Sequence, residues 1–125
     1  MIHTFSLAFT DDENTSATVY TSTQSGDGQT NVDVLIPSGQ SNYPVAVNID
    51  ISEVKGVLIN SDIDATLLFK YGGATIQTMV FSGNKPLLWQ AGFPNTNPIT
   101  GDFTGIIVSS ATADMKLKAF FLQNV

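Results

Sequence analysis

The feature of this sequence that most constrains its fold is a repeated alternation of apolar and polar residues over short runs. The clearest run, VAVNIDI from position 45, has an aliphatic residue at every second position. Similar runs recur along the chain between clusters of Gly, Pro, Asn, Asp and Ser, a pattern typical of β-strands joined by turns. Only ISEVKG, residues 51–56, could hold a helical turn. We therefore expect an all-β protein with about ten short strands.

The length and the number of strands narrow the architecture. A chain of 125 residues can bury a sizeable core, so we expect one domain over 1–125. About ten strands exceed the seven or nine of an immunoglobulin-like sandwich, and this favours an antiparallel, jelly-roll-like β-sandwich over that alternative. Two segments resemble each other, GVLINSDIDATLLF from Gly56 and GIIVSSATADMKLKAF from Gly105. Each predicts a β-hairpin.

The charge of the chain excludes several classes of partner. Charged residues make up 13 % of the sequence, the formal net charge is −6, and all five basic residues are lysines. Phosphate and guanine recognition normally relies on arginine, so we expect no nucleic acid and no anionic membrane as partner. The first residues already show a strand pattern, and we expect neither a signal peptide nor a membrane span. Weak charge protects β-strand edges poorly, which favours association with a partner or a homo-oligomer.

Few residues could support catalysis or metal binding. His3 is the only histidine and lies in a strand pattern, and the chain has no cysteine, so a zinc site has too few ligands. The acidic clusters at 11–14 and 62–64 could hold calcium or serve as ordinary turns, and the sequence leaves that choice open. We expect no enzyme, no cofactor, no metal and no small-molecule substrate.

Trp89, the single tryptophan, lies just before a loop rich in proline. Our main interpretation is a structural anchor, with Pro86 fixing the chain before a short strand and Trp89 sealing one end of the sandwich from inside. Contact with a protein partner and stacking on a sugar ring are the alternatives. The neighbouring strand residues are leucines rather than further aromatics, which counts against a lectin.

The same stretch carries a resemblance. NKPLLW at 84–89 and NPIT at 97–100, followed by an aliphatic strand, resemble small structural proteins of tailed-phage virions, most closely head decoration (cement) proteins. The resemblance spans 45–125 and does not include the first 44 residues. Ile99 stands where those proteins have an aromatic residue.

The resemblance implies a virion component with a jelly-roll-like fold. The implied partner is the major capsid protein, and the implied location is the capsid surface, after synthesis in the host cytoplasm. The alternative is a carbohydrate-binding or adaptor module of a phage tail fibre. We expect the loop from Ala91 to Phe103 to contact the partner, since long loops are often functional. The expected contact residues are Phe93, Pro94, Asn97 and an exposed Phe103.

Overall fold

The structure is a computed structural model that describes residues 2–11, 14–109 and 113–124. Within these ranges the regular elements are ten strands and one short 3₁₀ helix, which confirms the expected all-β class. The bounds are β1 Ile2–Asp11, β2 Asn14–Ser25, β3 Gly28–Ile36, β4 Tyr43–Ile49, η1 Ile51–Glu53, β5 Val54–Ser61, β6 Ala65–Tyr71, β7 Ala74–Phe81, β8 Leu87–Gln90, β9 Phe103–Ser109 and β10 Met115–Gln123.

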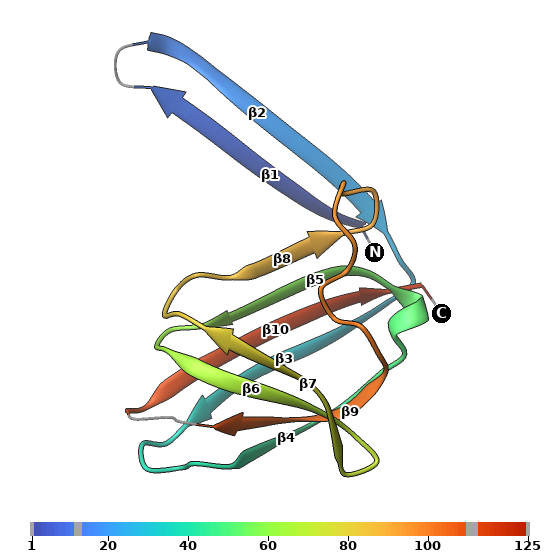
Figure 1. Cartoon of the computed structure of the whole chain (residues 1–125). Coiled ribbons are helices and arrows are strands. Elements are labelled where there is room, and N and C mark those ends of the chain that lie inside the picture. The colour runs from blue at the N-terminus through green and yellow to red at the C-terminus, as the bar shows by residue number, and fades with distance from the viewer. Residues whose placement is uncertain (1, 12–13, 110–112, 125) are drawn as a thin grey trace.

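Eight of these strands form a jelly-roll sandwich, as expected. One sheet has the order β3-β10-β5-β8 and the other β4-β9-β6-β7 (Figure 1). All neighbours within the two sheets are antiparallel. The first and last strands of the sandwich, β3 and β10, are neighbours, and the chain passes repeatedly between the sheets, as in a jelly roll and not in an immunoglobulin fold.

The strands β1 and β2 form a separate two-stranded sheet. They pair in antiparallel fashion from Ile2 opposite Ser25 outward, and the hairpin projects away from the sandwich (Figure 1). At its root, Gly26 lies so close to the Gln123 carbonyl that a Cβ would clash with that oxygen. Glycine is therefore required where the hairpin joins the sandwich.

The two predicted hairpins in the similar segments are wrong. The strands β5 and β6 belong to different sheets, and so do β9 and β10. A short polar turn such as Ser61-Asp62-Ile63-Asp64 suits a hairpin or a crossing between sheets equally well, because both need only a reversal of the chain. The hairpin that does form in the sandwich joins β6 and β7, where Gly72 and Gly73 both have positive φ, as a tight two-residue turn requires.

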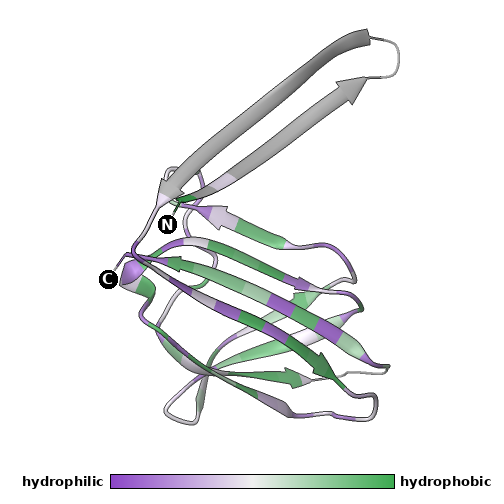
Figure 2. Ribbon diagram, turned by 180° about the vertical axis from the view of Figure 1, so that it is seen from behind, coloured by the Kyte–Doolittle hydropathy of each residue, from purple (hydrophilic) through white to green (hydrophobic). Residues whose placement is uncertain are grey.

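The core lies between the two sheets and follows the alternation in the sequence. Figure 2 shows hydrophobic and hydrophilic residues alternating along the strands of the sandwich, and one apolar set from each sheet faces the space between the sheets. At the centre, the Phe103 ring lies 5.0 Å from the Phe69 ring and 5.6 Å from the Phe121 ring, both in edge-to-face geometry. Since Phe121 comes from the opposite sheet, the three rings join the two layers.

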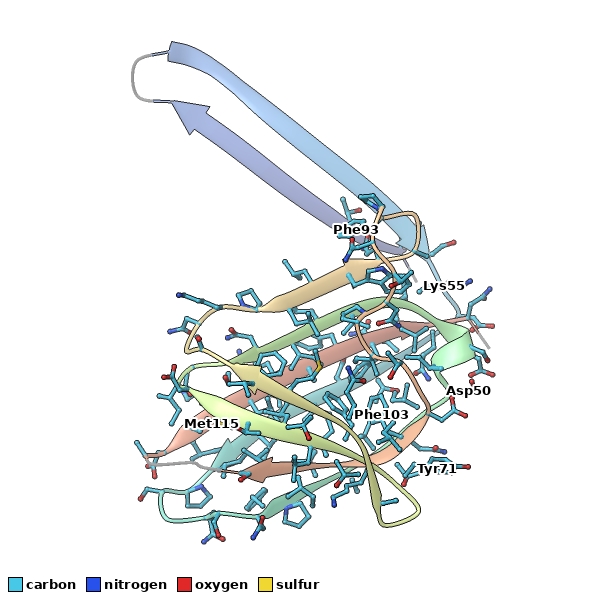
Figure 3. All side chains as sticks on the ribbon, in the orientation of Figure 1. Asp50, Lys55, Tyr71, Phe93, Phe103 and Met115 are labelled. Atoms are coloured by element: carbon cyan, nitrogen blue, oxygen red, sulfur yellow. The ribbon has the colours of Figure 1, made fainter. Side chains whose placement is uncertain are left out.

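The expectation that Phe103 is exposed is wrong. Its side chain is fully buried and lies between the sheets (Figure 3). The reason is that Phe103 is the first residue of β9 and pairs with Ile49, a buried residue of β4. The residue therefore ends the loop as part of the core and is not a surface contact.

We expect Phe103→Ala to lower the free energy of unfolding by about 3–5 kcal/mol, since it removes a large ring from a closed core. Urea denaturation followed by fluorescence measures this loss. Val80→Ala is the control: Val80 is 80 % exposed, and its truncation should change stability by no more than about 0.5 kcal/mol. A loss below about 1 kcal/mol for Phe103→Ala would contradict the central position of this ring.

Candidate functional site

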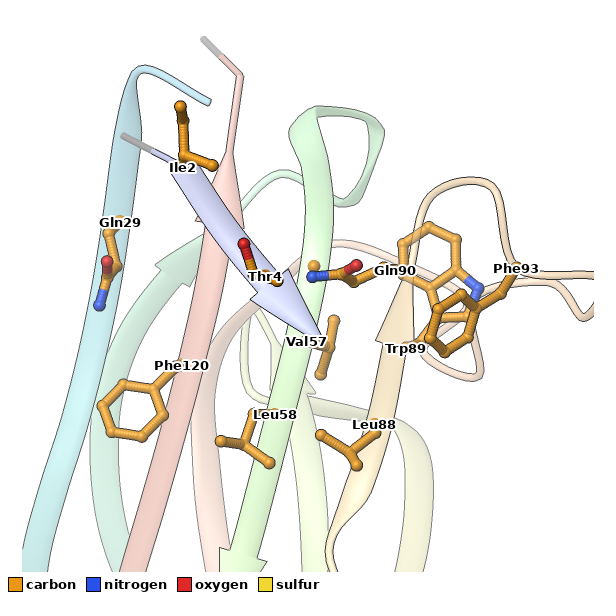
Figure 4. A pocket seen from close by; sticks show the side chains of 11 residues that line it. Ile2, Thr4, Gln29, Val57, Leu58, Leu88, Trp89, Gln90, Phe93 and Phe120 are labelled. Atoms are coloured by element: carbon orange, nitrogen blue, oxygen red, sulfur yellow. The ribbon is translucent and has the colours of Figure 1, made fainter. Parts of the chain in front are cut away.

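A groove lies on the outer face of the β3-β10-β5-β8 sheet, beside the root of β1 (Figure 4). Its floor is a row of apolar side chains, because Phe120 pairs with Leu58 and Leu58 pairs with Leu88 on three neighbouring strands. The volume is about 460 Å³, within the usual range of binding pockets, roughly 300–1,000 Å³. We call it the outer groove; it is lined by Ile2, Thr4, Gln29, Gly56, Val57, Leu58, Leu88, Trp89, Gln90, Phe93 and Phe120.

The lining of the outer groove is uncharged. Each of its eleven described residues is apolar, aromatic, glycine or a neutral polar residue, although the whole chain has a net charge of −6. Its polar side chains come from Thr4, Gln29 and Gln90. The groove therefore suits a neutral, largely apolar occupant.

Gln90 provides the polar feature of the groove. The residue is 7 % exposed, and its Oε1 has no hydrogen-bond partner among the described residues. By contrast, Gln29 donates to Asn31, and Thr4 also has an interaction of its own. A buried acceptor without a donor lowers stability by about 1–3 kcal/mol. The groove therefore contains an acceptor that a bound donor would satisfy.

Trp89 lies between the core and the groove. It is half-buried and packs against the hydrophobic core, while it also lines the groove beside Phe93. Its indole Nε1 donates to the Asn95 carbonyl at 2.9 Å. Pro86 is exposed immediately before β8. Trp89 thus contributes to both the core and the surface.

The predicted contact loop is fastened to β7 along part of its length. The Gln77 amide donates to the Pro98 carbonyl at 2.6 Å, and its oxygen accepts from the Thr100 backbone N–H at 3.1 Å. The Asn97 side chain accepts from the Ile99 backbone N–H, and the Ile99 side chain is buried. Asn97 therefore shapes its own loop.

The remaining two predicted contact residues lie nearer the start of the loop. Phe93 is half-buried in the wall of the outer groove, and Pro94 is exposed. Phe93 and Pro94 therefore both remain accessible to a partner.

A second apolar surface lies on the β6–β7 hairpin, and the sequence interpretation missed it. The described residues include five exposed large hydrophobic side chains, and three of them are spaced along this hairpin: Tyr71 at 54 %, Ile76 at 38 % and Val80 at 80 % exposure. We call these three residues the β7 patch. Met79-Val80-Phe81 was the available signal, because three consecutive apolar residues of a strand cannot all face the core. The loop adjoins the patch, since a Cβ at Gly101 would lie 3.4 Å from Cδ1 of Ile76.

The acidic turns serve the fold in the described part of the chain. Asp62 accepts from the Lys116 backbone N–H, and Asp64 accepts from the Gly83 backbone N–H, each at 2.8 Å. Among the described residues, no group of three or more His, Cys, Asp or Glu side chains could hold a metal ion. In the 11–14 cluster, residues 12 and 13 lie outside the described ranges. At η1, hydrogen bonds from the Ser52 side chain and backbone lower the pKa of Asp50.

The described part of the chain also lacks any helix long and apolar enough to cross a membrane.

Comparisons with known proteins give little further information. No model of a protein family matches the chain, and no curated protein matches it. One solved structure, of Bacillus endospore appendages described as "a novel family of disulfide-linked pili", is similar at 13 % sequence identity and a TM-score of 0.42, covering 78 % of this chain and 88 % of the other. A likeness at that level carries no conclusion about function.

We expect Gln77→Ala to loosen the loop, because it removes both hydrogen bonds to Pro98 and Thr100 at a cost of about 1–2 kcal/mol. Hydrogen exchange measured by NMR should show faster exchange of the Thr100 amide. The control is Thr78→Ala, an exposed neighbour on the same strand. Equal exchange of the Thr100 amide in the two variants would show that Gln77 does not hold the loop.

Proposed function

We propose that this chain is a non-enzymatic structural protein of a tailed-phage virion, most like a head decoration protein that binds the capsid exterior and stabilises it. The resemblance at 84–89 and 97–100 supports this role. In the structure, 84–89 runs into β8, and 97–100 is the part of the loop that Gln77 holds against β7. The family-like residues therefore adjoin the β7 patch.

The main support for the proposal is that three of the five exposed large hydrophobic side chains among the described residues lie along the β6–β7 hairpin. β7 is an edge strand of its sheet, and an apolar edge with little charge is a surface that proteins normally cover. Lys70 is the only charged residue in β6 and β7. A chiefly apolar contact is sufficient for a decoration protein, since many copies bind one lattice and each stabilises it by mass action.

A carbohydrate-binding module of a tail fibre is the second candidate. The observation that favours it is the pair Trp89 and Phe93 beside the Gln90 amide in the outer groove, since aromatic faces and amides can both contact sugars. However, a sugar ring presents several hydroxyl groups, and the groove has one side-chain oxygen without a partner among its described residues, on Gln90. The groove therefore fits a sugar less well than an apolar protein segment.

The test is co-sedimentation of the purified protein with matched capsids that lack it. We expect wild type to bind at low and high salt alike, because an apolar contact is weakly screened. Val80→Asp should weaken binding by at least about tenfold, as expected for a charge placed in a desolvated contact. Leu35→Asp is the matched control, since Leu35 is 57 % exposed on the other sheet.

Two results would contradict the proposal. The first is a wild type that remains in the supernatant at every salt concentration. The second is equal binding by Val80→Asp and Leu35→Asp, which would remove the β7 patch from the contact. If the wild-type protein does not bind capsids but binds a glycan array, the carbohydrate-binding module of a tail fibre becomes the better-supported function.

A further inference from the structure

The projecting hairpin is incomplete as an isolated unit. Its strands β1 and β2 pair with each other and with no third strand of the described chain, and the hairpin points away from the sandwich (Figure 1). A two-stranded hairpin alone is marginally stable in water, and it needs further strands or a packing surface. To be stable, the hairpin therefore needs to pack against a surface other than its own sandwich.

The composition of the hairpin indicates what that surface is like. β1 and β2 together contain no Lys, Arg, Pro or Gly, and Asp11, at the end of β1, is their one acidic residue. Ten of their 22 residues (10 in β1 and 12 in β2) are Ser or Thr, and in the sequence Phe5, Leu7 and Phe9 occupy alternate positions. The two strands thus combine apolar residues with hydroxyl donors, and between Ile2 and Thr10 and along β2 they lack the Asp, Glu, Lys and Arg side chains that normally protect strand edges.

The outer groove has the complementary chemistry. Its described lining is uncharged and largely apolar, and the Gln90 Oε1 needs a donor. A Ser or Thr hydroxyl, or a backbone N–H, would supply that donor. The chain's own hairpin contributes only its root to the groove, through Ile2 and Thr4, and the rest of it projects away from the sandwich (Figure 1).

We propose that the hairpin of one copy lies in the outer groove of a second copy, and that the second copy returns the same contact in a two-fold dimer. Both halves of the interface are on every chain, as a self-complementary two-fold contact requires. The net charge of −6 on each copy is no obstacle at the groove itself, because its described lining is uncharged and the acidic residues of the hairpin, Asp11, Asp12 and Glu13, are consecutive in the sequence where β1 ends. The proposal is independent of the capsid role, which uses the β7 patch on the other sheet.

The first test is the oligomeric state of the full chain by sedimentation velocity. We expect wild type to be a dimer and Leu88→Asp to raise the dimer dissociation constant by at least about tenfold, since the charge lies on the floor of the groove. Val80→Asp introduces the same charge on the sheet that does not carry the outer groove, and this variant should remain a dimer. Circular dichroism checks that both variants are folded. A monomeric wild type at every attainable concentration would overturn the proposal, and so would equal dimerisation of the two variants.

The second test uses the absence of cysteine from the chain, because any disulfide must then join introduced residues. A Leu88→Cys chain is mixed with an Ala8→Cys chain under oxidising conditions, and we expect a disulfide-linked heterodimer. Val80→Cys mixed with Ala8→Cys is the control and should give none. Three outcomes would overturn the proposal: no heterodimer in the first mixture, equal yields in both mixtures, or preferential linkage of Ala8→Cys to itself, which would place two hairpins edge to edge.

Discussion

The edge-to-face contact of three phenylalanine rings holds the two sheets of the sandwich together. Phe103 bridges Phe69 of its own sheet and Phe121 of the opposite sheet, so the two layers meet around one side chain. Such aromatic pairs contribute about 0.5–1.5 kcal/mol each beyond the area that they bury. The jelly-roll connections place β10 between β3 and β5, and Phe121 is therefore held on both sides. The outer groove and the β7 patch lie on the two sheets that these rings join.

The loop before Phe103 shows how the core determines the surface. Its end is fixed because Phe103 is in the core, its middle because Ile99 is buried, and its start because the Trp89 indole donates to Asn95. Gln77 then holds the remaining backbone against β7. Because the loop is attached to the sandwich at its start, middle and end, its backbone is fixed against the sandwich. Pro94 and the β7 patch remain exposed.

The sequence predicts the sandwich well because its evidence is local. The alternation from Val45 to Ile51 directly reports which side chains face the core, and the Tyr71-Gly72-Gly73 segment reports a turn. The pairing of the strands cannot be predicted in the same way. The Ser61–Asp64 turn does not indicate whether the strand after it joins the same sheet as the strand before it. The outer groove could not be predicted for the same reason: Phe120, Leu58 and Leu88 are distant in the chain and meet only through the strand order. The unpartnered Gln90 oxygen depends on that order as well.

We infer that the sandwich is complete within one chain, whereas the hairpin and the outer groove complete each other only between two chains. Amide hydrogen exchange of the full-length protein at increasing concentrations tests this most directly. We expect β9 and β10 to be equally protected throughout, because their protection comes from the core of one chain. Protection of β1, β2 and the groove strand β8 should rise together as dimers form. Protection of the hairpin that is already complete at the lowest concentration, or that never develops at any concentration, would contradict the claim.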